Sequence, residues 1–124
     1  MRSERAVIAR AVAKATRQTE RELSRQVQDF LKLDGWRVLK QEAMKWGDRQ
    51  AGELGMPDLL ALRYNTEFRG ILWIEVKRKG AQPKPHQAAW HAAEHALGAE
   101  VWVVDNFDEF RGKYLNSGLN RSIR

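Results

Sequence analysis

The sequence predicts a single α/β domain, with a mixed central β-sheet flanked by helices, on the basis of three observations. The chain has 124 residues, which suits one compact domain with one hydrophobic core. Segments with helical and strand periodicity follow one another in the order α-β-β-β-α-β. We find no internal repeat, low-complexity tract or interdomain linker in the sequence.

Two helices are expected before the first strand. Residues 4–18 place apolar side chains on one stripe among basic ones, which predicts a basic amphipathic helix over residues 1–18. This helix could contact phosphate or a second subunit, or simply dock on the core. Thr19 suits the N-cap of a second helix that ends near Leu33. The apolar face of that helix consists of Leu23, Val27, Phe30 and Leu31.

Three strands should follow the second helix. Asp34-Gly35 ends the helix, and residues 36–41 form the first strand. Residues 58–63 and 71–77 are apolar, β-biased runs separated by polar residues and glycine, which is the pattern of an antiparallel hairpin. Residues 42–56 contain glycines and charges without a clean period and are expected to form a loop.

A further helix and a last strand complete the expected sheet. Residues 86–97 form an alanine-rich helix, and residues 100–105 form a final buried strand. Apolar residues return at helical spacing from Phe110 to Leu115. Residues 116–124 are expected to be a flexible basic tail.

The charge of the chain favours a polyanionic partner. Lys and Arg number 22 against 16 Asp and Glu, which gives a formal net charge of +6. A basic surface without a binding role is the alternative. The absence of cysteine excludes disulfides, thiolate zinc sites and cysteine nucleophiles, so a metal must bind oxygen or imidazole. No apolar run reaches the roughly 20 residues of a bilayer span, so we expect a cytoplasmic protein without membrane contact.

Two carboxylates are expected to meet at one edge of the sheet. Asp58 begins one hairpin strand and Glu75 lies near the end of its antiparallel neighbour. Neighbouring negative charges raise each other's pKa unless a cation compensates them, and Mg²⁺ or Mn²⁺ prefers such oxygen ligands. The carbonyl of Val76 could add a third ligand.

Lys77 should share a strand face with Glu75, because side chains two residues apart point to the same side. Its amine could orient or help to deprotonate an attacking water and stabilise charge on phosphate oxygens. Taken alone, Glu-x-Lys is more often a surface ion pair and Pro57-Asp58 more often begins a turn. The apolar run 71–74 leads directly into these charges, which favours a catalytic edge.

These motifs together resemble the virus-type replication-repair nuclease family, VRR-NUC, of the PD-(D/E)XK nucleases. The resemblance rests on Gly55-Met56-Pro57-Asp58, Glu75-Val76-Lys77, Gln87 and Trp90, and it spans Thr19 to Phe110. It implies a restriction-endonuclease-like core over residues 19–115 and a structure-selective DNA nuclease, a group that includes four-way junction resolvases. It also implies that Asp58 and Glu75 bind metal, that Lys77 is the catalytic lysine and that Gln87 supports the site.

The family also has a glutamate on its first core helix, for which Glu20 and Glu22 are candidates. Helical geometry places Glu20 on the side of Leu23 and Val27, whereas Glu22 points toward solvent. We therefore favour Glu20 as a catalytic residue. Compensation of the helix dipole is the alternative role for both.

The helix that carries Gln87 contains other polar candidates. Gln87 could simply be a helix-start residue. His91 and His95 are four residues apart, but they lack the acidic partner of a zinc helix motif, so we expect exposed histidines.

Basic residues near the motifs are expected to contact DNA phosphates rather than to read bases. Trp46 could stack on an opened base or anchor its loop. The expected DNA-binding residues are Lys45, Arg49, Arg78, Lys79 and Lys84.

A homodimer is expected, because so small a nuclease has one active site and resolving a four-way junction needs two symmetric cuts. The amino-terminal helix, Trp73 and Trp102 are candidate interface residues, although both tryptophans could equally lie in the core. Branched or flapped DNA is the expected partner. A catalytically silent DNA-binding module and an RNA-processing nuclease remain as alternatives.

Overall fold

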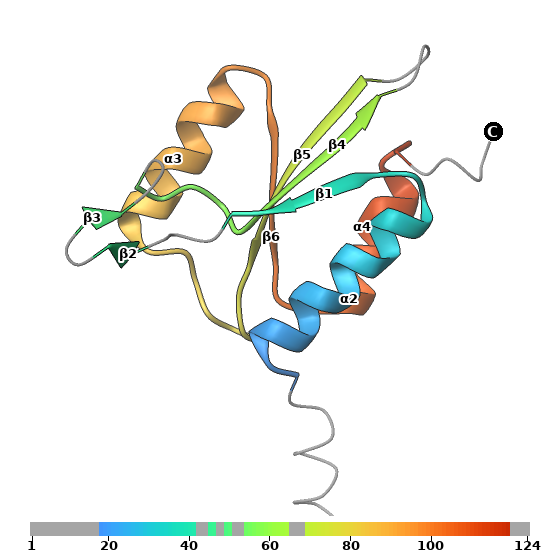
Figure 1. Cartoon of the computed structure of the whole chain (residues 1–124), viewed down its shortest axis with the longest axis horizontal. Coiled ribbons are helices and arrows are strands. Elements are labelled where there is room, and N and C mark those ends of the chain that lie inside the picture. Colours follow the sequence, from blue (N-terminus) through green and yellow to red (C-terminus); the bar gives the residue numbers. More distant parts are fainter. Residues whose placement is uncertain (1–17, 42–44, 47–48, 51–53, 65–68, 120–124) are drawn as a thin grey trace, which may run out of the picture.

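The computed structural model describes residues 18–41, 45–46, 49–50, 54–64 and 69–119, and it contains a four-stranded sheet with helices against it (Figure 1). The strands lie in the order β1-β4-β5-β6; the β5–β6 pair is parallel and the other two pairs are antiparallel. This arrangement confirms the predicted mixed α/β fold. The strands of the sheet are β1 (Arg37–Lys40), β4 (Leu59–Tyr64), β5 (Arg69–Val76) and β6 (Glu100–Val104), and the helices are α2 (Glu20–Leu33), α3 (Pro85–Ala96) and α4 (Phe107–Asn116). The predicted helix over residues 1–18 lies outside the described residues, apart from Gln18.

Helix α2 begins and ends where the sequence predicts. The Thr19 hydroxyl accepts a hydrogen bond from the Glu22 backbone N–H at 3.1 Å, which satisfies one of the free donors of the first turn. At the other end Gly35 has φ 92°, a backbone conformation that a glycine adopts without strain. The chain then turns directly into β1.

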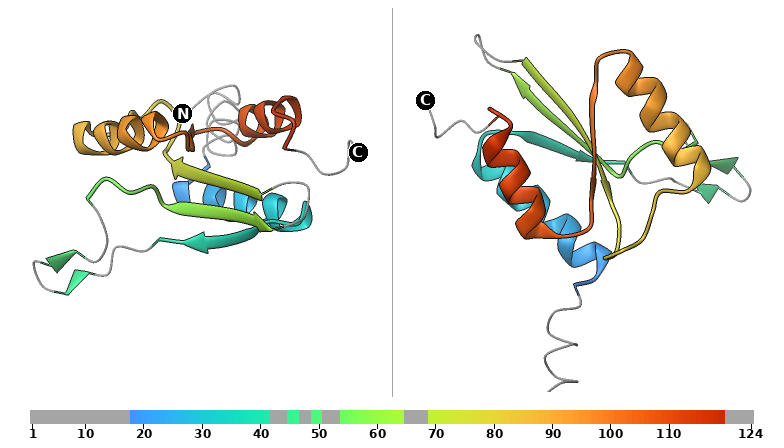
Figure 2. Two further views of the ribbon diagram at one scale, coloured as in Figure 1. Left: turned by 90° about the horizontal axis from the view of Figure 1, so that it is seen from above. Right: turned by 180° about the vertical axis from the view of Figure 1, so that it is seen from behind.

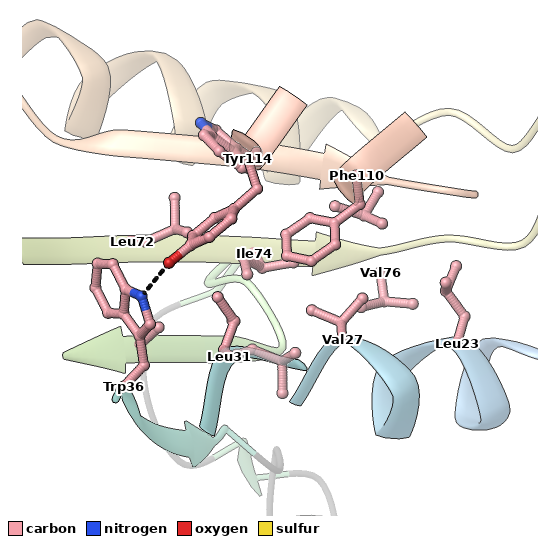
Figure 3. Packing of buried hydrophobic residues seen from close by; sticks show 13 residues of the cluster. Leu23, Val27, Leu31, Trp36, Leu72, Ile74, Val76, Phe110 and Tyr114 are labelled. Atoms are coloured by element: carbon pink, nitrogen blue, oxygen red, sulfur yellow. Dashed lines mark hydrogen bonds between the residues drawn. The ribbon is translucent and has the colours of Figure 1, made fainter. Parts of the chain in front are cut away.

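The core lies between the sheet and the helices α2 and α4, which lie side by side and apart from α3 (Figures 1 and 2). Buried side chains of α2 face Leu72, Ile74 and Val76 of β5 (Figure 3). Phe30 of α2 meets the rings of α4 edge to face at centroid distances of 5.2–5.7 Å. Aromatic packing of this kind joins the two helices into one layer.

The sheet differs from the sequence prediction in two respects. Strand β6 was expected to be buried, but it is an edge strand on which Trp102 and Val104 are buried while Val103 is 45% exposed. Residues 42–56 were expected to form a loop, yet β2 (Lys45–Trp46) and β3 (Arg49–Gln50) pair there as a short antiparallel hairpin. A strand of two residues is too short to show the alternation of apolar and polar residues by which strands are recognised in a sequence.

The packed domain also extends beyond the predicted boundary at residue 115. Helix α4 continues to Asn116, and the Leu119 carbonyl accepts a hydrogen bond from Arg63 Nη2 at 2.6 Å and lies 3.1 Å from the Tyr114 hydroxyl oxygen. Residues 117–119 therefore belong to the fold, which corrects the prediction of a flexible tail from residue 116. Residues 120–124 lie outside the described part of the chain.

A buried polar cluster ties β1 and β4 to α4. The guanidinium of Arg63 is 4.4 Å from the centre of the Trp36 ring and forms an ion pair with Asp34 at 3.7 Å. Trp36 Nε1 donates to the Tyr114 hydroxyl at 2.9 Å (Figure 3). The hydroxyl in turn donates to Asp34. Burial and the bond to Asp34 raise the pKa of Tyr114 to about 12, so the phenol stays neutral.

Neither tryptophan proposed for a dimer interface is a free surface residue. Trp102 is only 3% exposed and belongs to the core, which rules it out as an interface residue. The Trp73 ring packs edge to face against Trp90 of α3 at 5.0 Å. Of the helices in the described ranges, none is both long and apolar enough to span a bilayer.

Candidate active site

Asp58 immediately precedes β4, and the register of β4 with β5 places it opposite Glu75. The strand begins at Leu59, one residue later than predicted, because the Asp58 side chain takes over the pairing. Asp58 Oδ2 accepts the Val76 N–H at 2.9 Å, and the Asp58 carbonyl accepts the Gln41 N–H at 2.6 Å. Asp58 is thus held through its carboxylate by β5 and through its backbone by the residue that follows β1.

Glu75 is a buried carboxylate with one oxygen satisfied and one left over. Its side chain lies on β5 at 1% exposure. Oε1 accepts a hydrogen bond from Gln87 Nε2 at 2.6 Å and lies 3.5 Å from Lys77 Nζ. Oε2 is buried and has no hydrogen-bond partner within the described residues. An unpartnered buried carboxylate oxygen is costly, so it indicates a place for a bound group.

Burial raises the pKa of both carboxylates, and the charge of Asp58 adds to the rise at Glu75. Burial and, next, the charge of Asp58 raise the pKa of Glu75 to about 7, while the ammonium of Lys77 opposes the rise. Burial also raises the pKa of Asp58, and the hydrogen bond from Val76 limits that change. A divalent cation would supply the missing positive charge, so the pair fits Mg²⁺ or Mn²⁺. No group of three or more His, Asp or Glu residues in the described ranges is arranged to hold a metal, so backbone oxygen or water must complete any such site.

The raised pKa of Glu75 makes stability depend on pH in the absence of divalent ions. The folded state holds the Glu75 proton more tightly than the unfolded chain, so its contribution is full below about pH 4.5 and is lost as pH rises through about 7. We expect the free energy of unfolding of Glu75→Gln, relative to wild type, to increase over that interval in urea titrations with a chelator.

The comparison with Glu75→Gln is needed because His91 changes the pH dependence of stability in the opposite direction. Burial lowers the pKa of His91, so its contribution to stability is gained as pH rises through the unfolded-state value. If the free energy of unfolding changes with pH in the same way for wild type and Glu75→Gln, the raised pKa of Glu75 would be contradicted.

Gln87 makes hydrogen bonds both at the start of α3 and to Glu75. Its Oε1 accepts the Lys84 N–H at 2.8 Å at the start of α3, while its Nε2 donates to Glu75. The helix start therefore orients the amide that holds the Glu75 carboxylate. A part for Gln87 in catalysis stays a prediction.

The structure brings Glu20, rather than Glu22, toward the site. Glu20 Oε1 accepts the Arg78 backbone N–H at 3.0 Å, one residue beyond Lys77. Glu22 is exposed, and its backbone N–H bonds the Thr19 cap. Glu20 is itself exposed at the start of α2, so its catalytic role stays a prediction.

Three of the five predicted DNA-binding cations line one groove. The groove has a volume of about 1340 Å³ and is lined by Arg78, Lys79 and Lys84 together with Lys77 and Glu20. The side chains of Lys45, Arg49 and Trp46 lie outside the described part of the structure, although their backbones form β2 and β3.

His91 is a residue whose position the sequence analysis missed. It was expected to be exposed, yet it is half-buried, and its Nε2 is buried without a hydrogen-bond partner among the described residues. Burial and the nearby charge of Lys77 lower its pKa. The available signal was its spacing of four from Gln87, which places both on one face of α3.

Gly55 belongs to the motif recognised in the sequence, but its packing against α3 was not predicted. It has φ +91°, and a Cβ there would collide with the carbonyl oxygen of His86 and lie 3.1 Å from Trp90 Cβ. The absence of a side chain thus lets the segment before Asp58 pack directly on α3.

Known proteins provide an independent comparison for this geometry. A solved structure of a VRR_NUC domain matches with a TM-score of 0.59 and 25% sequence identity, covering 76% of this chain and 91% of that one. The "Putative nuclease p44" of Acyrthosiphon pisum secondary endosymbiont phage 1 is 39% identical over 57 residues. Together, the two matches support a VRR-NUC family nuclease.

The two matches differ in extent. The solved VRR-NUC domain is covered almost in full, whereas the alignment with the phage relative spans 46% of this chain and 58% of the relative. No family model matches the chain. The fold and the carboxylate pair therefore carry most of the argument for a nuclease of this family.

Proposed function

We propose that this protein is a metal-dependent, structure-selective DNA endonuclease that acts on branched DNA such as four-way junctions. The observation that supports this most strongly is the pairing of half-buried Asp58 with buried Glu75 beside Lys77, with Glu75 Oε2 lacking a hydrogen-bond partner among the described residues. Such a pair is costly to bury without a positive charge. In a metal-dependent nuclease, such a pair of carboxylates would bind the ion that is needed for phosphodiester hydrolysis.

The residues that would hold Mg²⁺ or Mn²⁺ are Asp58, Glu75 and the carbonyl of Val76. Bound there, the ion would compensate both carboxylates, lower the pKa of a water and polarise the phosphate. A hard divalent ion suits these oxygen donors, and the chain has no cysteine to attract a softer metal.

The side chains of the site divide the remaining work. Lys77 can orient the attacking water and donate to a phosphate oxygen, and its ammonium offsets the negative charge that grows there during attack. Gln87 holds Glu75 in one orientation through the 2.6 Å hydrogen bond. The Val76 N–H does the same for Asp58 at 2.9 Å. Water attacks phosphorus, the bond to the leaving oxygen breaks, and no covalent enzyme intermediate is needed.

The cations of the groove favour recognition of DNA shape over sequence. Arg78, Lys79 and Lys84 are exposed around the entrance to Lys77, where they would neutralise backbone phosphates. Phosphate contacts fix register and orientation but carry no base information. A branched substrate would be selected by the path of its backbone.

We also propose that two copies act together on a junction, each supplying one active site. A single small domain with one carboxylate pair makes one cut at a time, and two symmetric cuts suit a two-fold dimer. The sedimentation mass of the protein with and without junction DNA tests this directly.

The nuclease proposal predicts cutting that requires both a divalent ion and Asp58. We expect wild-type protein to cleave four-way junctions faster than linear duplex in Mg²⁺ or Mn²⁺, and to cleave nothing in a chelator. Asp58→Asn should bind the same DNA yet lose cleavage by about 10³-fold or more, because it weakens the metal site. Gel assays with end-labelled strands measure both.

Each alternative has its own result in that assay. Tight binding without ion-dependent cutting by wild type would indicate a silent DNA-binding module. Preferred cutting of a matched RNA substrate would indicate an RNA-processing nuclease instead.

A further inference from the structure

The turn formed by residues 78–81 leads out of the candidate active site and carries two of its cations. Ala81 N–H donates to the Arg78 carbonyl at 3.0 Å, and Gly80 has φ +81°, as the third position of a type II turn requires. Lys77, just before the turn, donates its N–H to the Val104 carbonyl at 2.8 Å. The exposed side chains of Arg78 and Lys79 are thus attached to backbone that continues directly from the site.

Two carboxylates from different elements hold the backbone of this turn. Glu20 Oε1 accepts the Arg78 N–H at 3.0 Å, and Asp105 Oδ2 accepts the Gly80 N–H at 3.2 Å. Glu20 is the first residue of α2, whereas Asp105 follows β6 and precedes Asn106, the N-cap of α4.

Both carboxylates belong to one packed frame. The Phe30 ring of α2 meets the Phe107 ring of α4 edge to face at 5.7 Å. The Asn106 side chain fixes the start of α4 by accepting the Glu109 N–H at 2.9 Å. The turn is therefore attached at two points to a layer that does not depend on DNA for its order.

The negative charge of these carboxylates disfavours the binding of DNA phosphates in the groove. Lys77, Arg78, Lys79 and Lys84 line the groove, and Glu20, Asp105 and Asp108 place negative charge among them. A carboxylate that acted through charge alone would repel phosphate and weaken DNA binding. The hydrogen bonds that Glu20 and Asp105 accept from the turn give these residues a structural role, which compensates for their unfavourable charge.

We propose that Asp105 is a positioning residue for the substrate. With Glu20, it fixes the backbone of the 78–81 turn so that Arg78 and Lys79 are held ready for the backbone phosphates of a DNA strand entering the site. The ordering of these residues is then completed during folding, which lowers the entropy lost on binding. This inference rests on the proposed nuclease function, because it concerns the same substrate.

Three variants of the full chain separate positioning from charge. Asp105→Ala removes the acceptor, Asp105→Asn keeps an oxygen for Gly80, and Asp108→Ala removes a groove carboxylate that makes no hydrogen bond to the turn in the described structure. For a labelled junction in Ca²⁺, we expect Asp105→Ala to raise Kd about threefold to tenfold. Its KM should rise likewise in Mg²⁺, with kcat changed less than about twofold.

For the two controls, the Kd for DNA should fall or stay unchanged. Asp105→Asn and Asp108→Ala each remove one negative charge, so both should bind DNA as tightly as wild type or more tightly. Binding by Asp105→Ala that is as tight as binding by Asp108→Ala would overturn the inference.

A measurement without DNA distinguishes failure of this inference from failure of the nuclease proposal. Amide exchange of Gly80, followed by NMR, should be faster in Asp105→Ala than in wild type and in Asp108→Ala. Unchanged exchange would also overturn the inference, as would wild-type protein that binds no DNA. Protein that shows these exchange and affinity differences but cuts nothing would overturn the nuclease proposal alone.

Discussion

Replacing Lys77 with methionine should lower kcat for junction cleavage by about 10³-fold while leaving the fold and DNA binding nearly intact. Within the described residues, Lys77 forms an ion pair with the carboxylate pair, with its Nζ 3.5 Å from Glu75 Oε1. Lys77→Met keeps most of the volume and removes the charge that would stabilise the attacked phosphate. Steady-state cleavage at saturating DNA gives kcat, and fluorescence anisotropy gives affinity.

Lys79→Met is the matched control for that experiment. Lys79 lines the same groove two residues away, but it is exposed and makes no described contact with Glu75. We expect it to raise Kd a few-fold, to reduce the salt dependence of binding by about one phosphate contact and to change kcat little. Similar losses of kcat in both variants would mean that Lys77 contributes only to general electrostatic attraction.

The sequence predicted most of the fold because its strongest signals are local. The apolar face of α2 and its Thr19 cap are set by nearest neighbours, and both appear where expected. The pairing of β4 with β5 follows from two β-biased runs and a short connection. The meeting of Asp58 and Glu75 then follows from hairpin geometry.

Features that depend on contacts between distant segments were not predicted. The half-burial of His91 depends on how α3 meets the site, and the bond from Gly80 to Asp105 depends on the parallel β5–β6 pair. The role of Leu119 requires a buried arginine 56 residues earlier in the chain. No periodicity in the sequence encodes these contacts, since each is chosen by tertiary packing.

The requirement for glycine at position 55 is such a tertiary feature, and it leads to the largest stability effect that we expect. Gly55→Ala combines two penalties, because the residue has φ +91° and the new Cβ would meet the backbone of His86 and the Cβ of Trp90. The left-handed conformation costs about 1–2 kcal/mol for alanine, and overpacking against backbone adds about 1–3 kcal/mol. The segment that carries Pro57 and Asp58 must then move away from α3, so junction cleavage should fall together with stability.

Gly98→Ala isolates the first of these penalties. Gly98 has φ +95°, and a Cβ there would meet nothing within 4 Å. It should lower the free energy of unfolding by only about 1–2 kcal/mol and leave cleavage unchanged at temperatures where the protein stays folded. Urea denaturation of both variants measures the difference, which reports the contact between Gly55 and α3. Equal destabilisation would show that the segment before Asp58 tolerates a side chain, and the close packing of Gly55 on α3 would then not be what places Asp58.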